Sequence, residues 1–95
     1  MLEHLPRDCV LEVLREIHRV LAQEGRVSLR VPNLAAAIGA YHMALDFTHI
    51  TPFTEFSFMQ LLEAAGFAPE RMVFQCQAPA CFGRCAHGIA HFFEY

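Results

Sequence analysis

The sequence predicts a small α/β domain, and three observations support this fold class. Two segments show the apolar spacing of amphipathic helices, and three others show the alternation or composition of strands. Helices and strands alternate along the chain, which is typical of a layered sheet with at least one helical crossover. The 95 residues are enough for one domain, near the low end of the usual size range.

The first helix is predicted over residues 8–23. Asp8 is the expected N-cap, and Gly25 is expected to end the helix in a left-handed conformation. Polar residues occupy the opposite face. The apolar residues recur at helical spacing, at Val10, Val13, Leu14, Ile17, Val20 and Leu21.

Three strands are predicted. Residues 26–32, "RVSLRVP", alternate apolar and polar side chains and end at a proline. "RMVFQCQ" and the terminal "IAHFFEY" are the other two. No helix separates them, so they are either antiparallel neighbours or a pair joined by a long loop. Two helices would cover one face of this sheet and leave the other poorly protected, which indicates half of a layered fold.

The second clear helix is predicted over residues 55–65. Thr54 is the expected N-cap, Phe53 and Phe58 occupy the two positions of a hydrophobic staple, and Gly66 ends the helix. Between the first strand and this helix the pattern is weaker. "LAAAIGAYHMAL" could form a helix weakened by its glycine, and "DFTHITPFT" reads as a loop. The phenylalanines are interpreted as core or interface residues.

Composition limits the partners. The net charge is −3, and the seven cations are single scattered arginines, so no nucleic-acid-binding surface is expected. There is no apolar run of the roughly 18 residues that span a bilayer. A signal-peptide pattern is also missing, so a cytoplasmic protein without membrane association is expected. Apolar residues make up 55% of the chain, which favours a homo-oligomer, a missing partner segment or a fragment.

Three stretches together resemble class I S-adenosylmethionine-dependent methyltransferases. They are "LEHLP", "REIHRVLAQEGRVSLRVPN" and "DFTHITPFTEFSFMQLLEAAGF", and they occur in the order seen in the ubiquinone- and menaquinone-biosynthesis branch. The resemblance covers roughly residues 2–75. It implies that residues 1–95 form one domain, the C-terminal part of a Rossmann-like methyltransferase fold ending in an antiparallel strand pair. Residues 33–53 would be its variable, substrate-side segment.

The resemblance also implies S-adenosylmethionine as the cofactor of a complete enzyme. The family holds it with a glycine-rich turn after the first strand and an acidic residue after the second. The glycines of this chain are isolated, so no tight cofactor binding is expected for the chain alone. A sheet edge left open by absent strands would pair with a missing N-terminal half or with a second copy of the chain.

Site residues follow from the same resemblance. Glu3 and His4 match a turn that faces the transferred methyl group, which implies catalytic roles for both and cofactor contacts for Leu2, Glu3 and His4. In some quinone-pathway members, an acidic and histidine cluster at this turn is associated with a divalent metal or with activation of a phenolic hydroxyl. The alternative is a solvated N-terminal turn.

The segment after the first predicted strand supplies the remaining candidates, because open α/β sheets bind ligands beyond the carboxyl ends of their strands. His49 is a candidate general base or substrate contact. Its alternative is a loop-packing histidine that caps the helix entry at Thr54 or binds the backbone. The candidate substrate contacts are Asn33, Tyr41, Asp46 and Thr48.

A cysteine and histidine cluster offers a competing zinc site. Cys81, Cys85, His87 and His91, with Cys76 upstream, are suitable zinc ligands, but their C-x3-C-x-H-x3-H spacing would make a cramped site. If the histidines lie on a strand, about 13 Å separates them. The alternative is that the cysteines are buried and reduced.

Three functions therefore remain open. The first is a small-molecule methyltransferase that is incomplete and inactive alone. The second is a non-catalytic module that dimerises or binds a partner. The third is a small zinc-binding module.

Overall fold

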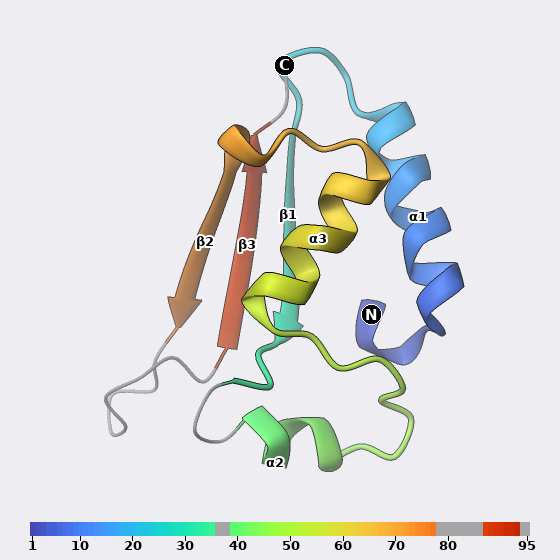
Figure 1. Cartoon of the computed structure of the whole chain (residues 1–95), viewed down its shortest axis with the longest axis vertical. Coiled ribbons are helices and arrows are strands. Elements are labelled where there is room, and N and C mark those ends of the chain that lie inside the picture. The colour runs from blue at the N-terminus through green and yellow to red at the C-terminus, as the bar shows by residue number, and fades with distance from the viewer. Residues whose placement is uncertain (36–38, 78–86, 94–95) are drawn as a thin grey trace.

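The protein is a small mixed α/β domain with a three-stranded sheet (Figure 1). The computed structural model describes residues 1–35, 39–77 and 87–93, and for residues 75–77 and 87–93 it describes the backbone alone. The predicted α/β class is confirmed. In chain order the elements are the 3-10 helix η1 (Leu2–His4), α1 (Arg7–Val20), β1 (Arg26–Pro32), α2 (Gly39–Ala44), α3 (Glu55–Ala65), the 3-10 helix η2 (Pro69–Arg71), β2 (Met72–Gln77) and β3 (His87–Phe93).

The strand order in the sheet is β1-β3-β2. The C-terminal strand is central and antiparallel to both neighbours, pairing Arg26 with Phe93 on one side and Met72 with Phe92 on the other. The outer strands β1 and β2 therefore run parallel to each other. The predicted antiparallel pairing of the last two strands is confirmed. Among the described residues, the edge of β1 that faces away from β3 has no strand beside it.

Helix α1 forms where predicted, but both of its expected ends are wrong. The N-cap is Pro6, which makes no side-chain hydrogen bond, and Asp8 lies in the first turn, where its charge suits the helix dipole. The helix ends at Val20 because Leu21 is already extended. The left-handed residue is Glu24, with φ of 64°, and not Gly25, whose amide closes a tight turn onto Ala22.

Helix α3 begins and ends as predicted. Thr54 and Ser57 form a reciprocal capping box, which satisfies two backbone amides that the first helical turn leaves unpaired. The Phe53 and Phe58 rings pack edge to face with their centroids 5.2 Å apart, which forms the expected staple. Gly66 ends the helix at φ of 108°, a conformation that favours glycine.

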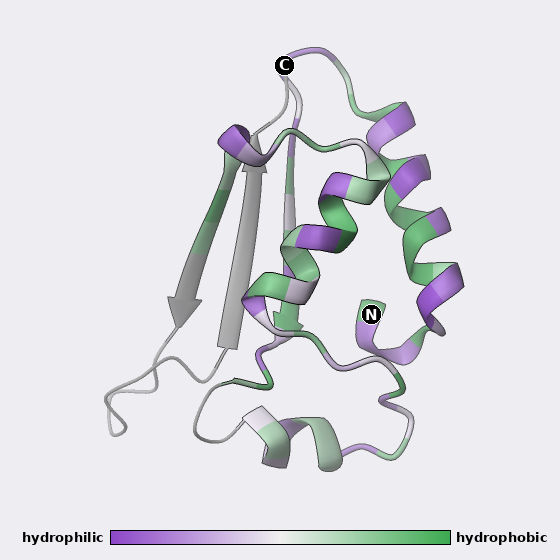
Figure 2. Ribbon diagram, viewed as in Figure 1, coloured by the Kyte–Doolittle hydropathy of each residue, from purple (hydrophilic) through white to green (hydrophobic). Residues whose placement is uncertain are grey.

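Helices α1 and α3 pack together on one side of the sheet, α3 over the strands and α1 beside it (Figure 1). The polar residues of α1 face away from α3 (Figure 2). On β1, Leu29 and Val31 face this core, whereas Arg26, Ser28 and Arg30 are exposed on the other face. The face of β1 that points away from the core is therefore polar, and it can contact water without a second layer to cover it. The buried apolar core comprises Leu2, Val10, Leu14, Leu29, Val31, Phe53, Phe58, Leu62, Ala65 and Phe67.

Helix α2 is shorter than the predicted apolar stretch and begins at its glycine. A Cβ on Gly39 would lie 1.8 Å from the Asn33 carbonyl oxygen, so only glycine fits this close backbone contact. Phe47 and Phe56 are strongly exposed, so Phe56 is not a core residue, and its alternative role at an interface stays a prediction. None of the helices in the described part of the chain is long and apolar enough to cross a membrane.

Candidate functional site

The backbone of η1 is bound directly to the loop that precedes α3. The Glu3 carbonyl oxygen accepts hydrogen bonds from the amides of Ile50, at 2.7 Å, and Thr51, at 3.1 Å. The Thr51 hydroxyl donates to the Leu5 carbonyl, and Thr51 is the only buried polar residue among those described. These bonds join two segments that are more than 40 residues apart in the sequence and place their side chains side by side.

The three predicted catalytic residues Glu3, His4 and His49 meet at this junction, and we call them the histidine–carboxylate cluster. One nitrogen or oxygen atom from each lies within 4.8 Å of the other two. The rings of His4 and His49 pack edge to face with centroids 4.6 Å apart. The His4 Nε2 lies 3.8 Å from the Glu3 Oε1. All three side chains are half-buried, so the cluster is held by the fold and still open to a ligand.

The His4 ring is oriented by a hydrogen-bonded chain. The Thr48 hydroxyl donates to the Asp46 Oδ1 at 2.6 Å, and the Thr48 Oγ1 lies 2.8 Å from the His4 Nδ1. A hydroxyl has one hydrogen, and Asp46 takes it, so the His4 Nδ1 must be the donor to Thr48. In the neutral ring, the His4 Nε2 then carries no hydrogen, and it lies on the side of the ring near Glu3.

The His49 ring is oriented by the backbone. Its Nδ1 lies 3.1 Å from the Met43 carbonyl oxygen, which can only accept a hydrogen bond. The neutral His49 ring is therefore protonated at Nδ1. Its Nε2, like that of His4, carries no hydrogen. His49 therefore binds the backbone, as its alternative role predicts, and it also lies in the cluster. Thr54 and Ser57 cap the start of α3, and His49 takes no part in this cap.

Two carboxylates give the site its negative charge. Hydrogen bonds from the Thr48 hydroxyl and amide hold the pKa of Asp46 below its usual value. Partial burial tends to raise the pKa of Glu3. Hydrogen bonds from the Met1 ammonium group and from the backbone, together with nearby positive charge, outweigh burial and place that pKa below its usual value. Both groups are therefore ionised at neutral pH.

The predicted substrate contacts Asn33 and Tyr41 lie outside the histidine–carboxylate cluster, and their contact with a substrate stays a prediction. The Asn33 side chain accepts a hydrogen bond from the Ala35 amide at 3.0 Å and so closes a local turn. Tyr41 is exposed on α2, where its ring contacts His42. The Leu2 side chain is buried in the core, and the expected cofactor contact of Leu2 stays a prediction. Asp46 and Thr48 join the site through His4, a role that the sequence alone does not indicate.

The predicted zinc set falls largely outside the described residues, which do not include Cys81 or Cys85. His87 and His91 both lie on strand β3. Four residues on a strand span about 13 Å along the backbone. A zinc site built from this set stays a prediction, because its cysteines lie outside the described residues.

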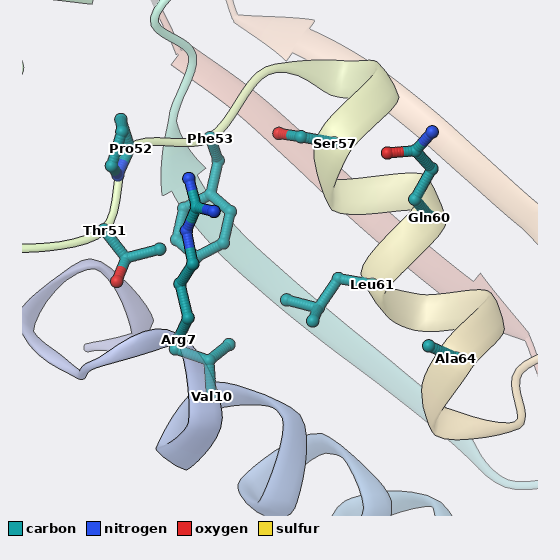
Figure 3. Close-up of a pocket in the computed structure, with 9 residues that line it drawn as sticks. All are labelled: Arg7, Val10, Thr51, Pro52, Phe53, Ser57, Gln60, Leu61 and Ala64. Atoms are coloured by element: carbon teal, nitrogen blue, oxygen red, sulfur yellow. The ribbon is translucent and has the colours of Figure 1, made fainter.

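One cavity lies beside Glu3, and another lies beside the start of α1. One, of 400 Å³, is lined by Met1, Glu3, Arg30, Val31 and Pro32, so it lies between Glu3 and the carboxyl end of β1. The other, of 480 Å³, lies between the start of α1, the loop before α3 and α3 itself, with Arg7 and Gln60 on opposite walls (Figure 3). No sequence motif indicates the second cavity, because its lining comes from three separate segments.

Comparisons with protein-family models, with curated proteins and with solved structures find no match.

Proposed function

We propose that this chain forms the acceptor-side part of a class I S-adenosylmethionine-dependent methyltransferase that acts on a small molecule. The observation that carries this proposal is the meeting of Glu3, His4 and His49. Glu3 and His4 come from the "LEHLP" stretch, which the resemblance places beside the transferred methyl group, and His49 comes from "DFTHITPFT" in the substrate-side segment. Sequence similarity alone does not require these stretches to touch, so their contact is independent support.

The position of the cluster agrees with this proposal. The cavity beside Glu3 is lined by Val31 and Pro32 at the end of β1, and ligands of open α/β sheets bind beyond the carboxyl ends of strands. Helix α1 leads from η1 to β1, as the crossover of a strand–helix–strand unit would. The free edge of β1 would then receive the strand that precedes η1 in such a unit.

The described residues do not fit the cofactor itself. At Gly25, Gly39 and Gly66, other atoms of the protein lie close to the position that a side chain would occupy, so none of these glycines leaves space for a ligand. Gly39 lies against the Asn33 carbonyl, and Gly66 ends α3 beside the His18 ring. No glycine-rich turn is available in this sequence to hold the carboxylate of the cofactor. In this proposal, the cofactor is held by a segment that pairs with the free edge of β1, either an N-terminal half or another chain.

The cluster supplies what the acceptor needs. A nucleophile must lose its proton to attack an electrophilic methyl group, and the free Nε2 atoms of His4 and His49 are suitable proton acceptors. The Glu3 carboxylate, 3.8 Å from the His4 Nε2, would stabilise the imidazolium that forms. General base catalysis of this kind is worth roughly 10²–10⁴-fold in rate.

The test is methyl transfer by this chain fused to, or mixed with, a methyltransferase N-terminal half that carries a glycine-rich turn. The assembly is expected to transfer labelled methyl groups to small-molecule acceptors. H49Q and E3Q should lower the rate by about 10²-fold or more, whereas H42Q, on α2 and outside the cluster, should leave it near the parent value. An H49Q rate equal to that of the parent would reject the assignment.

Self-association is the second candidate function, favoured by one face of α1. Val13, Ile17 and Val20 form an apolar stripe beside a 440 Å³ hollow, and Val20 is 65% exposed. This stripe and the free edge of β1 could bind a second copy. Sedimentation of the 95-residue chain tests this candidate. A dimer that I17E converts to monomer, and that R15E on the polar face does not, would support it. A monomeric parent chain at high concentration would reject it.

A further inference from the structure

We propose that the 480 Å³ cavity beside the start of α1 binds a small carboxylate with an apolar body, and that Arg7 holds its carboxylate. We call this the Arg7 cavity. Its lining includes none of Glu3, His4 and His49, so it is separate from the histidine–carboxylate cluster. The proposal therefore goes beyond methyl transfer, and it holds whether or not the chain takes part in that reaction.

The Arg7 cavity has the size and the apolar lining of a small-molecule site. Pockets that bind small molecules have volumes of about 300–1,000 Å³, and most of their lining is apolar with a few polar groups. Val10 and Phe53 are buried side chains of this lining, and Leu61 extends from α3 toward α1 (Figure 3). The apolar body of a ligand would leave water by packing against these three side chains.

Two of the polar side chains that line the cavity remain available to a ligand. The Thr51 hydroxyl donates to a backbone carbonyl, and the Ser57 hydroxyl belongs to the capping box of α3. Arg7 and Gln60 lie on opposite walls, and neither side chain has an ion pair or hydrogen bond with another described residue. One of these two groups is a cation and the other is neutral, so together they favour an anionic ligand.

The surroundings of Arg7 strengthen this preference for an anion. No acidic residue lines the cavity, and Asp8, the next residue in the chain, is not part of the lining. Arg7 is also the first residue of α1, where the helix dipole favours negative charge and opposes a cation. An anion bound at Arg7 would therefore interact favourably with both the guanidinium group and the end of the helix.

A single guanidinium group matches a carboxylate better than other charged groups. The planar fork of arginine binds the two oxygens of a carboxylate through parallel hydrogen bonds. A phosphate ester carries a charge of about −1.5 to −2 at neutral pH, which one cation does not balance. An ammonium group would be repelled by Arg7. The ligand class is therefore a monocarboxylate with an aromatic or branched aliphatic body.

The test is titration of the 95-residue chain with 3-phenylpropanoate, followed by ¹H–¹⁵N correlation spectra. Saturable shifts are expected at the amides of Val10, Phe53 and Leu61, which line the cavity. Two control ligands separate the two parts of the proposal. The neutral 3-phenylpropanamide keeps the apolar body, and acetate keeps only the carboxylate, so each should bind about 10-fold more weakly or worse.

Variants of the chain locate the site. R7Q should weaken the binding of 3-phenylpropanoate by about 10-fold or more, because it removes a charge-assisted pair of hydrogen bonds. R7K keeps the charge without the planar fork and should weaken binding by less than R7Q. R15Q is the matched control and should bind as the parent does, because Arg15 is exposed on α1 outside the cavity. Circular dichroism checks that each variant folds.

Four results would overturn the proposal. They are no saturable shift at the three amides, equal affinity of R7Q and the parent, equal binding of the amide and the carboxylate, and equal binding of acetate, which would mean an adventitious ion only. All of these are binding measurements on the chain alone, with no methyl donor present. Failure here and failure of the proposed function are therefore distinguishable.

Discussion

His4 and Thr48 are 44 residues apart in the sequence, and the His4 Nδ1 lies 2.8 Å from the Thr48 Oγ1. Because the Thr48 hydroxyl donates its own hydrogen to Asp46, this contact fixes which ring nitrogen of His4 carries the proton. It also joins the loop before α3 to the N-terminal turn. One contact therefore orients a candidate site residue and connects the two segments that build the site.

The buried Thr51 hydroxyl is expected to contribute to stability because it satisfies the Leu5 carbonyl. T51V leaves that acceptor without its partner and should lower the free energy of unfolding by about 1–3 kcal/mol. T48V removes a hydroxyl from an exposed side chain and should change it by less than about 0.5 kcal/mol. Urea unfolding followed by circular dichroism measures both. Equal stability of T51V and the parent would contradict the described junction.

Leu14 and Val20 share the apolar stripe of α1 in the sequence but differ in burial. Leu14 is fully buried, so L14A should destabilise the domain by about 2–5 kcal/mol, or leave it unfolded without denaturant. Val20 is 65% exposed, and V20A should cost less than about 0.5 kcal/mol. Denaturant midpoints of the two variants provide the comparison. Similar losses of stability in L14A and V20A would contradict the described packing of α1, in which Leu14 is buried and Val20 is exposed.

S-adenosylmethionine is expected to give no saturable heat when titrated into the 95-residue chain. The reason is that the chain has no glycine-rich turn to hold the carboxylate of that molecule. Injection into buffer serves as the blank. Tight, saturable binding to this chain would contradict the proposal that another segment holds the cofactor.

Local signals in the sequence predicted most of the elements. Thr54, Phe53 and Gly66 define the start and end of α3 through contacts within a few residues, so their residue types suffice. The end of α1 was less predictable. Gly25 looked like a left-handed stop, but the turn places Glu24 in that conformation and uses Gly25 for a close approach to Ala22.

The candidate site was predictable only in part. The motifs named Glu3, His4 and His49, and the structure brings them together. The hydrogen-bond chain through Asp46 and Thr48 depends on a long-range contact that no periodicity encodes. The central place of β3 in the sheet was equally hidden, because strand order is set by pairing between distant segments.

The protonation of the two imidazoles tests the site most directly. Long-range ¹H–¹⁵N correlation spectra of the metal-free chain distinguish the two neutral tautomers of each histidine. The structure predicts that His4 and His49 are both protonated at Nδ1, and that T48V changes the spectrum of His4 while His49 keeps its Nδ1 proton. Spectra showing both rings protonated at Nε2 would contradict the account, because no free nitrogen would then face Glu3.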